Sequence, residues 1–99
     1  MKNLVIVDFP TLKDKVAEME ATFKTALVDT RAFDGCISID VYFDEEGSTF
    51  TLVEDWESFD HYDKYLAWRM ETGLGELLAP LLDGGPEALK VRKFQYKDV

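Results

Sequence analysis

Changes in the spacing of apolar residues divide the chain into predicted strands and helices. Residues Asn3 to Phe9 are mostly apolar and predict a short buried strand. The apolar residues that follow recur at helical spacing up to about Arg31: Leu12, Val16, Met19, Phe23, Ala26 and Leu27. Thr11 is placed to cap this first helix, with Asp14 completing a weak capping box.

Between Cys36 and Asp44, apolar residues recur at every second position, which is typical of a strand with one buried face. The residues expected to share that face are Ile37, Ile39, Val41 and Phe43. Residues 44–48 form an acidic loop with a late glycine, as in a hairpin, and the next strand runs from Thr49 to Trp56. These two strands are therefore predicted to pair in an antiparallel way.

A second helix is expected after Ser58, which is placed to cap it. Its apolar stripe consists of Phe59, Tyr62, Leu66 and Met70. Gly73 and Gly75 break that helix, and the leucines at 77, 78, 81 and 82 predict a further short helical turn.

The chain is expected to end in a strand from Leu89 to Tyr96, whose apolar residues change parity between Val91 and Phe94. That change predicts a bulge or burial of both faces. The resulting order is β-α-β-β-α-β, an α+β fold of the ferredoxin-like class with an antiparallel sheet, in a single domain over residues 1–99. Because both helices would cover one sheet face, two sheets packed face to face would form a barrel across a homodimer.

Composition narrows the range of partners. The chain has 11 Lys and Arg against 20 Asp and Glu, a net charge of −9, so nucleic acid and anionic membrane surfaces are poor partners. The apolar fraction of 46% is high for so short a chain and favours burial against a second subunit. The single Cys36 and a first apolar run limited to Leu4 to Val7 predict a soluble, cytoplasmic protein without signal segment or membrane span.

The residue types present exclude several kinds of site. One histidine and one cysteine cannot assemble a two-histidine iron site or a thiolate-rich zinc site within one chain. Gly73-Leu74-Gly75 follows a helix rather than a strand and lacks the third glycine of a dinucleotide-binding fingerprint. An enzyme built on this chain is therefore expected to work without a bound metal, nucleotide or flavin.

Glu54 and Trp56 lie two residues apart on the third strand and therefore share one sheet face. The Trp56 indole either packs in the core or lines a cavity between the sheet and the helices. A carboxylate on that face has a raised pKa unless it is paired. Glu54 is thus expected either to pair, with Arg69 or a backbone amide, or to act as a base at a substrate site.

The second helix and the first strand supply the other candidates. Tyr65 and Arg69 lie at the edge of the apolar stripe, where they can reach a pocket, while His61 lies further round, toward solvent or a covering loop. The structural alternatives are a boundary tyrosine and an exposed first-turn histidine. Asn3 opens the first strand and either projects its amide into the same cavity or is a terminal polar residue.

Three segments resemble the antibiotic biosynthesis monooxygenase family of dimeric α+β barrels: T-R-A-F-D-G-C at 30–36, E-D-W-E-S at 54–58 and Y-L at 65–66. The resemblance implies a homodimer in which each protomer has a substrate cavity between its sheet and its helices, lined by Trp56. A histidine is common in the family where this chain has Tyr65. The haem-degrading branch pairs a first-strand asparagine with a helix histidine, but His61 falls a turn too early for that chemistry.

The resulting hypothesis is cofactor-independent monooxygenation, with O₂, of a phenolic, quinol or polycyclic aromatic substrate. Trp56 would stack on the ring, Tyr65 would hydrogen-bond a substrate oxygen, and a cationic side chain would offset the developing charge. The candidate residues are Trp56, Tyr65 and His61 for catalysis and Asn3, Glu54 and Arg69 for substrate binding, with no metal and no cofactor. Two alternatives stay open: a non-catalytic aromatic-ligand-binding or interaction module, and an isomerase or decarboxylase with Glu54 or His61 as general base.

Overall fold

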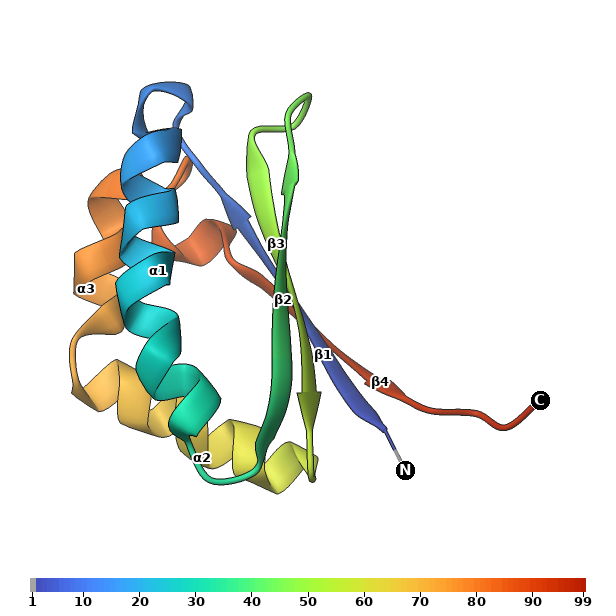
Figure 1. Cartoon of the computed structure of the whole chain (residues 1–99). Coiled ribbons are helices and arrows are strands. Elements are labelled where there is room, and N and C mark those ends of the chain that lie inside the picture. The colour runs from blue at the N-terminus through green and yellow to red at the C-terminus, as the bar shows by residue number, and fades with distance from the viewer. Residues whose placement is uncertain (1) are drawn as a thin grey trace.

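The computed structural model describes residues 2–99 and has a four-stranded antiparallel sheet with helices on one of its faces (Figure 1). The strands are β1 (Asn3–Pro10), β2 (Cys36–Asp44), β3 (Thr49–Trp56) and β4 (Lys90–Gln95), and the helices are α1 (Val16–Ala32), α2 (Phe59–Glu71) and α3 (Leu74–Leu78). Short 3₁₀ turns lie at Lys13–Lys15, Ala79–Leu81 and Pro86–Ala88. The strand order is β2-β3-β1-β4, which confirms the predicted ferredoxin-like α+β fold. No helix within residues 2–99 is long and apolar enough to cross a membrane.

The core lies between the sheet and the helices, because alternate residues of the two central strands point that way. Its buried strand residues are Val5, Val7 and Phe9 of β1 and Phe50, Leu52, Glu54 and Trp56 of β3. Helix α1 covers them with Met19, Phe23 and Leu27, at the predicted helical spacing. The Phe23 ring meets Phe9 and Phe50 edge-on, with ring centroids 5.1 and 5.4 Å away.

The two predicted helix caps have different outcomes. Ser58 caps α2 as expected, and its Oγ accepts a hydrogen bond of 3.1 Å from the backbone N–H of His61. The predicted cap at Thr11 is wrong. Its hydroxyl donates to the carbonyl of Phe9, at 2.8 Å, and the 3₁₀ turn Lys13–Lys15 precedes α1 without a side-chain cap. Thr11 is buried as an extension of the strand, so its hydroxyl satisfies the strand end rather than the helix.

The outer strands are less buried than the residue pattern predicts, because both are sheet edges. In β2 a bulge lies between Cys36 and Ser38, and only Ile39 is fully buried. The other residues expected on that face stay more than a third exposed: Ile37, Val41 and Phe43. Strand β4 pairs with β1 without a register shift, and all its residues are exposed. The predicted bulge or double burial of the last strand is therefore wrong, since an edge strand is only partly covered.

The outer face of the sheet lies opposite the helices (Figure 1), and part of it is apolar. It carries half-buried Leu4, Ile6 and Val53 and exposed Tyr42 and Phe94. The Oδ1 atom of Asp55, also on this face, is buried without a hydrogen-bond partner within residues 2–99. A surface of this kind is typical of a face that packs against another layer.

Candidate functional site

A cavity of about 80 Å³ between the sheet and the helices α2 and α3 is the candidate site. Most of its lining is apolar, from β1, β4, α2 and α3. The polar side chains that reach it are Glu54, Tyr62, Tyr65 and Arg69. An apolar cavity with a few convergent polar groups is the usual form of a small-molecule site.

Glu54 places a carboxyl group inside the core. Its side chain is only 3% exposed, and its Oε1 accepts a hydrogen bond of 2.9 Å from the indole N–H of Trp56. Burial raises the pKa of Glu54 to about 7, and the hydrogen bond from Trp56 opposes that rise only in part. Within residues 2–99 it makes neither of the predicted pairings, with Arg69 or with a backbone amide. A carboxyl group that titrates near neutral pH can both accept and release a proton.

Trp56 lies behind Glu54 and not on the cavity wall. Its side chain is fully buried and is absent from the cavity lining. The ring packs among Phe33, Tyr62 and Tyr65, with centroids 6.4, 5.7 and 5.2 Å away. The structure therefore places Trp56 where it holds both the Glu54 carboxyl group and the aromatic cluster in position.

The Tyr65 hydroxyl is engaged by two partners that join α1 to α2. It lies 2.7 Å from the Oγ1 of Thr30 and accepts a hydrogen bond of 2.9 Å from the Nε of Arg69. The Nη2 of Arg69 donates to the same Thr30 hydroxyl, at 2.8 Å, and to the carbonyl of Ala26, at 2.6 Å. Burial raises the pKa of Tyr65 although these hydrogen bonds oppose the change, so the phenol stays protonated.

Arg69 is a buried cation without a carboxylate partner. Its side chain is 8% exposed, and none of the ion pairs within residues 2–99 includes it. The Trp68 and Tyr65 rings lie 4.6 and 5.4 Å from its Cζ and stabilise the charge through cation–π contact. The helical spacing predicts Arg69 at the edge of the apolar stripe of α2. In the structure its side chain is buried between α1 and α2.

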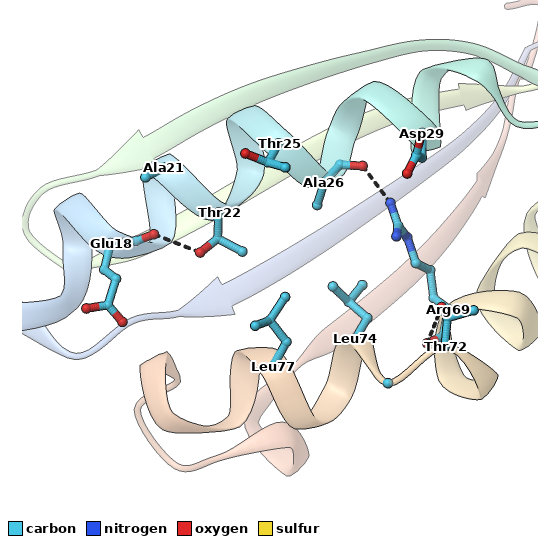
Figure 2. A pocket seen from close by; sticks show the side chains of 11 residues that line it. Glu18, Ala21, Thr22, Thr25, Ala26, Asp29, Arg69, Thr72, Leu74 and Leu77 are labelled. Carbon is cyan, nitrogen blue, oxygen red and sulfur yellow. Dashed lines mark hydrogen bonds between the residues drawn. The ribbon is translucent and has the colours of Figure 1, made fainter.

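A larger hollow, a groove of about 660 Å³, lies between α1 and α3 (Figure 2). Helix α1 contributes Glu18 and Asp29 to this groove, and α3 contributes Leu74 and Leu77. Arg69 and Leu74 line both the groove and the cavity, so the two hollows adjoin at these two side chains.

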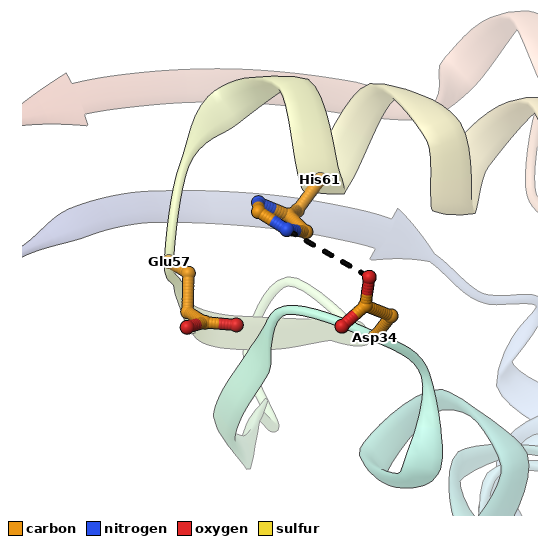
Figure 3. Close-up of side chains that lie close together, drawn as sticks. All are labelled: Asp34, Glu57 and His61. Atoms are coloured by element: carbon orange, nitrogen blue, oxygen red, sulfur yellow. Dashed lines mark ion pairs between the residues drawn. The ribbon is translucent and has the colours of Figure 1, made fainter.

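His61 lies at the start of α2, outside the cavity lining (Figure 3). Its Nδ1 is 2.6 Å from the Oγ of Ser58, and its Nε2 is 3.8 Å from the Oδ2 of Asp34. Asp34, Glu57 and His61 each offer one ligand atom, and these three atoms lie within 4.8 Å of one another. One histidine and two carboxylates could hold a divalent cation, although Asp34 and Glu57 are exposed, as acidic side chains commonly are. A search of the sequence for paired histidines or thiolates does not detect this group.

Asn3 ties the first strand to the end of the third. Its Nδ2 donates to the carbonyls of Trp56 and Glu57, at 3.1 and 2.9 Å. The amide therefore fixes the backbone beside Trp56, and Asn3 does not line the cavity.

Sequence analysis did not identify Thr30 or Tyr62 as site residues. Thr30 follows Phe23 and Leu27 at helical spacing, so a polar residue on an apolar stripe is the signal that could have revealed a buried hydroxyl. The helical spacing of α2 places Tyr62 only on the apolar stripe. It lines the cavity, and burial raises the pKa of its hydroxyl.

Comparison with known proteins assigns the chain to a family. The sequence model of the antibiotic biosynthesis monooxygenases matches residues 4–69. The chain belongs to the antibiotic biosynthesis monooxygenase family. The matched segment runs from β1 to the end of α2 and includes Glu54, Trp56, Tyr65 and Arg69. A search of curated proteins finds no match.

Solved structures share this fold over nearly the whole chain. A conserved protein from Methanosarcina mazei Go1 superposes with a TM-score of 0.82 at 21% identity, covering 98% of this chain and 94% of the other. Rv0793 from Mycobacterium tuberculosis gives a TM-score of 0.71 at 26% identity, with 100% and 98% covered. A crystal structure described as an antibiotic biosynthesis monooxygenase gives 0.81 at 16% identity, with 97% and 99% covered. These similarities support the antibiotic biosynthesis monooxygenase fold. The reaction has to be inferred from the residues of the site.

Proposed function

We propose that this member of the antibiotic biosynthesis monooxygenase family oxidises a small phenol or quinol with O₂ and without a cofactor. The observation that carries the proposal is Glu54, a buried carboxyl group on the cavity wall whose pKa lies near 7. Phenols ionise near pH 10 in water, so transfer of a proton to Glu54 is uphill by roughly 4 kcal/mol. The positive charge of Arg69, on the same cavity, offsets the charge of the phenolate.

The reaction balances without an external reductant. Glu54 accepts the phenolic proton, the phenolate passes one electron to O₂, and the two radicals join as a peroxide at a ring carbon that carries hydrogen. That carbon loses its proton as the O–O bond breaks and becomes a carbonyl. The departing oxygen takes up this proton and the one held on Glu54 and leaves as water. The substrate loses four electrons, O₂ gains four, and the products are a quinone and water.

The other candidate residues have supporting roles in this proposal. Trp56 holds Glu54 through its N–H instead of stacking on the substrate, because its side chain is fully buried. Tyr65 contributes its ring to the cavity wall, since its hydroxyl already has two partners. His61 and Asn3 lie outside the cavity lining, so the proposal gives them no contact with the substrate.

The volume of the cavity restricts the substrate. An apolar cavity of about 150 Å³ holds benzene, whereas this cavity measures about 80 Å³. A ring therefore enters only by displacing side chains of the cavity wall. Met70 of α2 is the most adaptable of these, because it is flexible and 65% exposed. A single ring needs a far smaller displacement than a polycyclic compound, so the proposal is limited to single-ring phenols and quinols.

Oxygen uptake by the metal-free protein tests this function. The assay uses hydroquinone and phenols with a free para position. It compares wild type with Glu54→Gln and with a control, Glu46→Gln, which changes an exposed carboxylate in the loop between β2 and β3. Wild type and the control should consume O₂ and release one quinone per O₂, while Glu54→Gln should lose a factor of at least about 100 in kcat. Full turnover by Glu54→Gln would show that Glu54 is not the base of this reaction.

Two other outcomes would redirect the assignment. Tight binding of the same compounds without oxygen uptake would indicate a non-catalytic module for aromatic ligands. Product formation under strict anaerobiosis would indicate an isomerase or decarboxylase on the same scaffold.

We also propose that the protein forms a homodimer through the outer face of its sheet. This face holds the half-buried apolar residues described above and the Oδ1 of Asp55, which is buried without a hydrogen-bond partner within residues 2–99. Its charges are complementary across the sheet, with Asp40 on the β2 edge and Lys90 on the β4 edge. A two-fold axis along the strands would set the acidic edge of each copy over the basic edge of the other. Val53→Asp should give a monomer in sedimentation analysis, and an unchanged dimer would exclude this face.

A further inference from the structure

Arg69 leaves part of its hydrogen-bonding capacity unused. Of its five N–H donors, one at Nε serves Tyr65 and those at Nη2 serve Ala26 and Thr30. No hydrogen bond from Nη1 occurs within residues 2–99, yet Nη1 is not among the fully buried atoms that lack a partner. The Nη1 amino group is therefore at least slightly exposed, on a side chain that lines three hollows.

Within residues 2–99, no acidic side chain forms an ion pair with Arg69. Burying a charge costs free energy unless the charge is paired. The chain has 20 Asp and Glu residues that could supply such a partner. Two of these, Glu18 and Asp29, line the same groove (Figure 2). Glu18 pairs with Lys15, at 3.9 Å, and Asp29 belongs to none of the ion pairs in the described part of the chain. The guanidinium is thus available to an anion from outside the chain.

Arg69 stands where the groove meets the cavity. It lines the groove of about 660 Å³, the cavity of about 80 Å³ and a small hollow of about 20 Å³, and Leu74 lines all three as well. Glu54 lines only the cavity. A ligand with its ring beside Glu54 would therefore bring a short substituent past Leu74 to the guanidinium.

We propose that the ligand is an aromatic carboxylate, a phenol or quinol whose ring enters the cavity and whose carboxylate binds the Nη1 of Arg69. The ring chemistry rests on the proposed function, whereas recognition of the carboxylate depends on Arg69 alone. A monoanion fits better than a phosphate or sulfate dianion, because Glu18 and Asp29 repel excess negative charge in the adjoining groove.

Anaerobic calorimetric titration at about pH 8 tests this inference with two probes that differ in one group, 2,5-dihydroxybenzoate and 2,5-dihydroxybenzamide. Wild type should bind the acid at least about tenfold more tightly, as expected for one charge-assisted hydrogen bond. Arg69→Gln should bind both probes equally, and Arg69→Lys should keep part of the preference because it keeps the charge. Equal affinities in wild type would overturn the proposal, and so would a preference that survives in Arg69→Gln.

A second variant keeps the test decisive if Arg69→Gln unfolds after losing its bonds to Ala26 and Thr30. Asp29→Asn removes an exposed acid that lines the groove and belongs to no ion pair within residues 2–99. It should tighten binding of the benzoate by about threefold and leave the benzamide unchanged. An unchanged benzoate affinity would contradict binding at this end of the groove.

The two proposals fail in different ways. A preference for the acid that depends on Arg69, without oxygen uptake in air, would refute the oxidation and support the carboxylate site. Oxygen uptake at equal KM for the acid and the amide would refute the carboxylate site and support the oxidation.

Discussion

The indole N–H of Trp56 donates a hydrogen bond of 2.9 Å to the Oε1 of Glu54, two residues earlier on the same face of β3. Both side chains are buried in the core. A hydrogen bond to the ionised carboxylate opposes the rise in pKa that burial causes. Trp56 therefore adjusts the proton affinity of Glu54 in addition to filling the core.

Replacing Trp56 by Phe should raise the pKa of Glu54 above its value of about 7. The substitution keeps an aromatic ring in the cluster and removes the N–H, and a hydrogen bond to a charged group contributes about 1.5–3 kcal/mol, or roughly 1–2 pH units. An NMR titration of the Glu54 carboxyl carbon measures the change. Trp68→Phe is the control, because Trp68 packs on Phe33 and Tyr65 without bonding Glu54. An unaltered titration in Trp56→Phe would show that burial alone sets this pKa.

Glu54 should make the protein less stable as the pH rises. Its carboxyl group titrates at 4.5 in the unfolded chain and near 7 in the folded one, so between these values the folded state holds the extra proton. The free energy of unfolding therefore falls across this window, by about 3 kcal/mol in total. Glu54→Gln removes the effect, so urea denaturation at about pH 4 and about pH 8 should show a smaller loss in the variant. Equal losses in the two proteins would contradict the buried, unpaired carboxyl group.

The hydroxyl of Thr30 should contribute far more to the free energy of unfolding than the hydroxyl of another threonine on the same helix. Thr30 is fully buried and bonds both Tyr65 and Arg69, so Thr30→Val leaves buried donors without partners and should cost about 1–3 kcal/mol. The matched control is Thr22→Val, because the Thr22 hydroxyl bonds only the carbonyl of Glu18 within α1 and should cost within about 0.5 kcal/mol. Chemical denaturation measures both, and equal costs would exclude a network between α1 and α2.

Gly35 should not tolerate a methyl group, because the His61 ring occupies the space. A Cβ at Gly35 would lie 2.3 Å from the Cγ of His61, and its φ of +91° already disfavours any other residue. Gly73→Ala, at φ +83° with no Cβ contact closer than 3.4 Å, isolates the backbone cost of about 1–2 kcal/mol. Gly35→Ala should cost clearly more, and adding His61→Ala should recover only part of the difference in thermal denaturation, because the Cβ of residue 61 stays 2.5 Å from the new methyl group. A Gly35→Ala variant no less stable than Gly73→Ala would contradict the close packing.

The regular elements could be predicted because their signals are local. Period-two spacing on β3 and helical spacing on α1 identify buried faces without knowledge of the partner. The cap at Ser58 likewise depends on residues within one turn of helix. The predictions for Thr11 and for β4 fail because they depend on the neighbours that each element has in the sheet. A strand at the edge and a strand at the centre have similar residue patterns.

The sequence by itself determined the order of elements, the sheet face shared by Glu54 and Trp56, and the placement of Tyr65 and Arg69 near a pocket. Only the tertiary structure decided which atoms meet. Arg69 bonds residues 39 and 43 positions away on α1 instead of Glu54, and His61 meets the loop before β2. The physical reason is that periodicity specifies the direction of a side chain from its own backbone. The hydrogen-bond partner of a long polar side chain depends on how distant elements pack, to within a few tenths of an ångström.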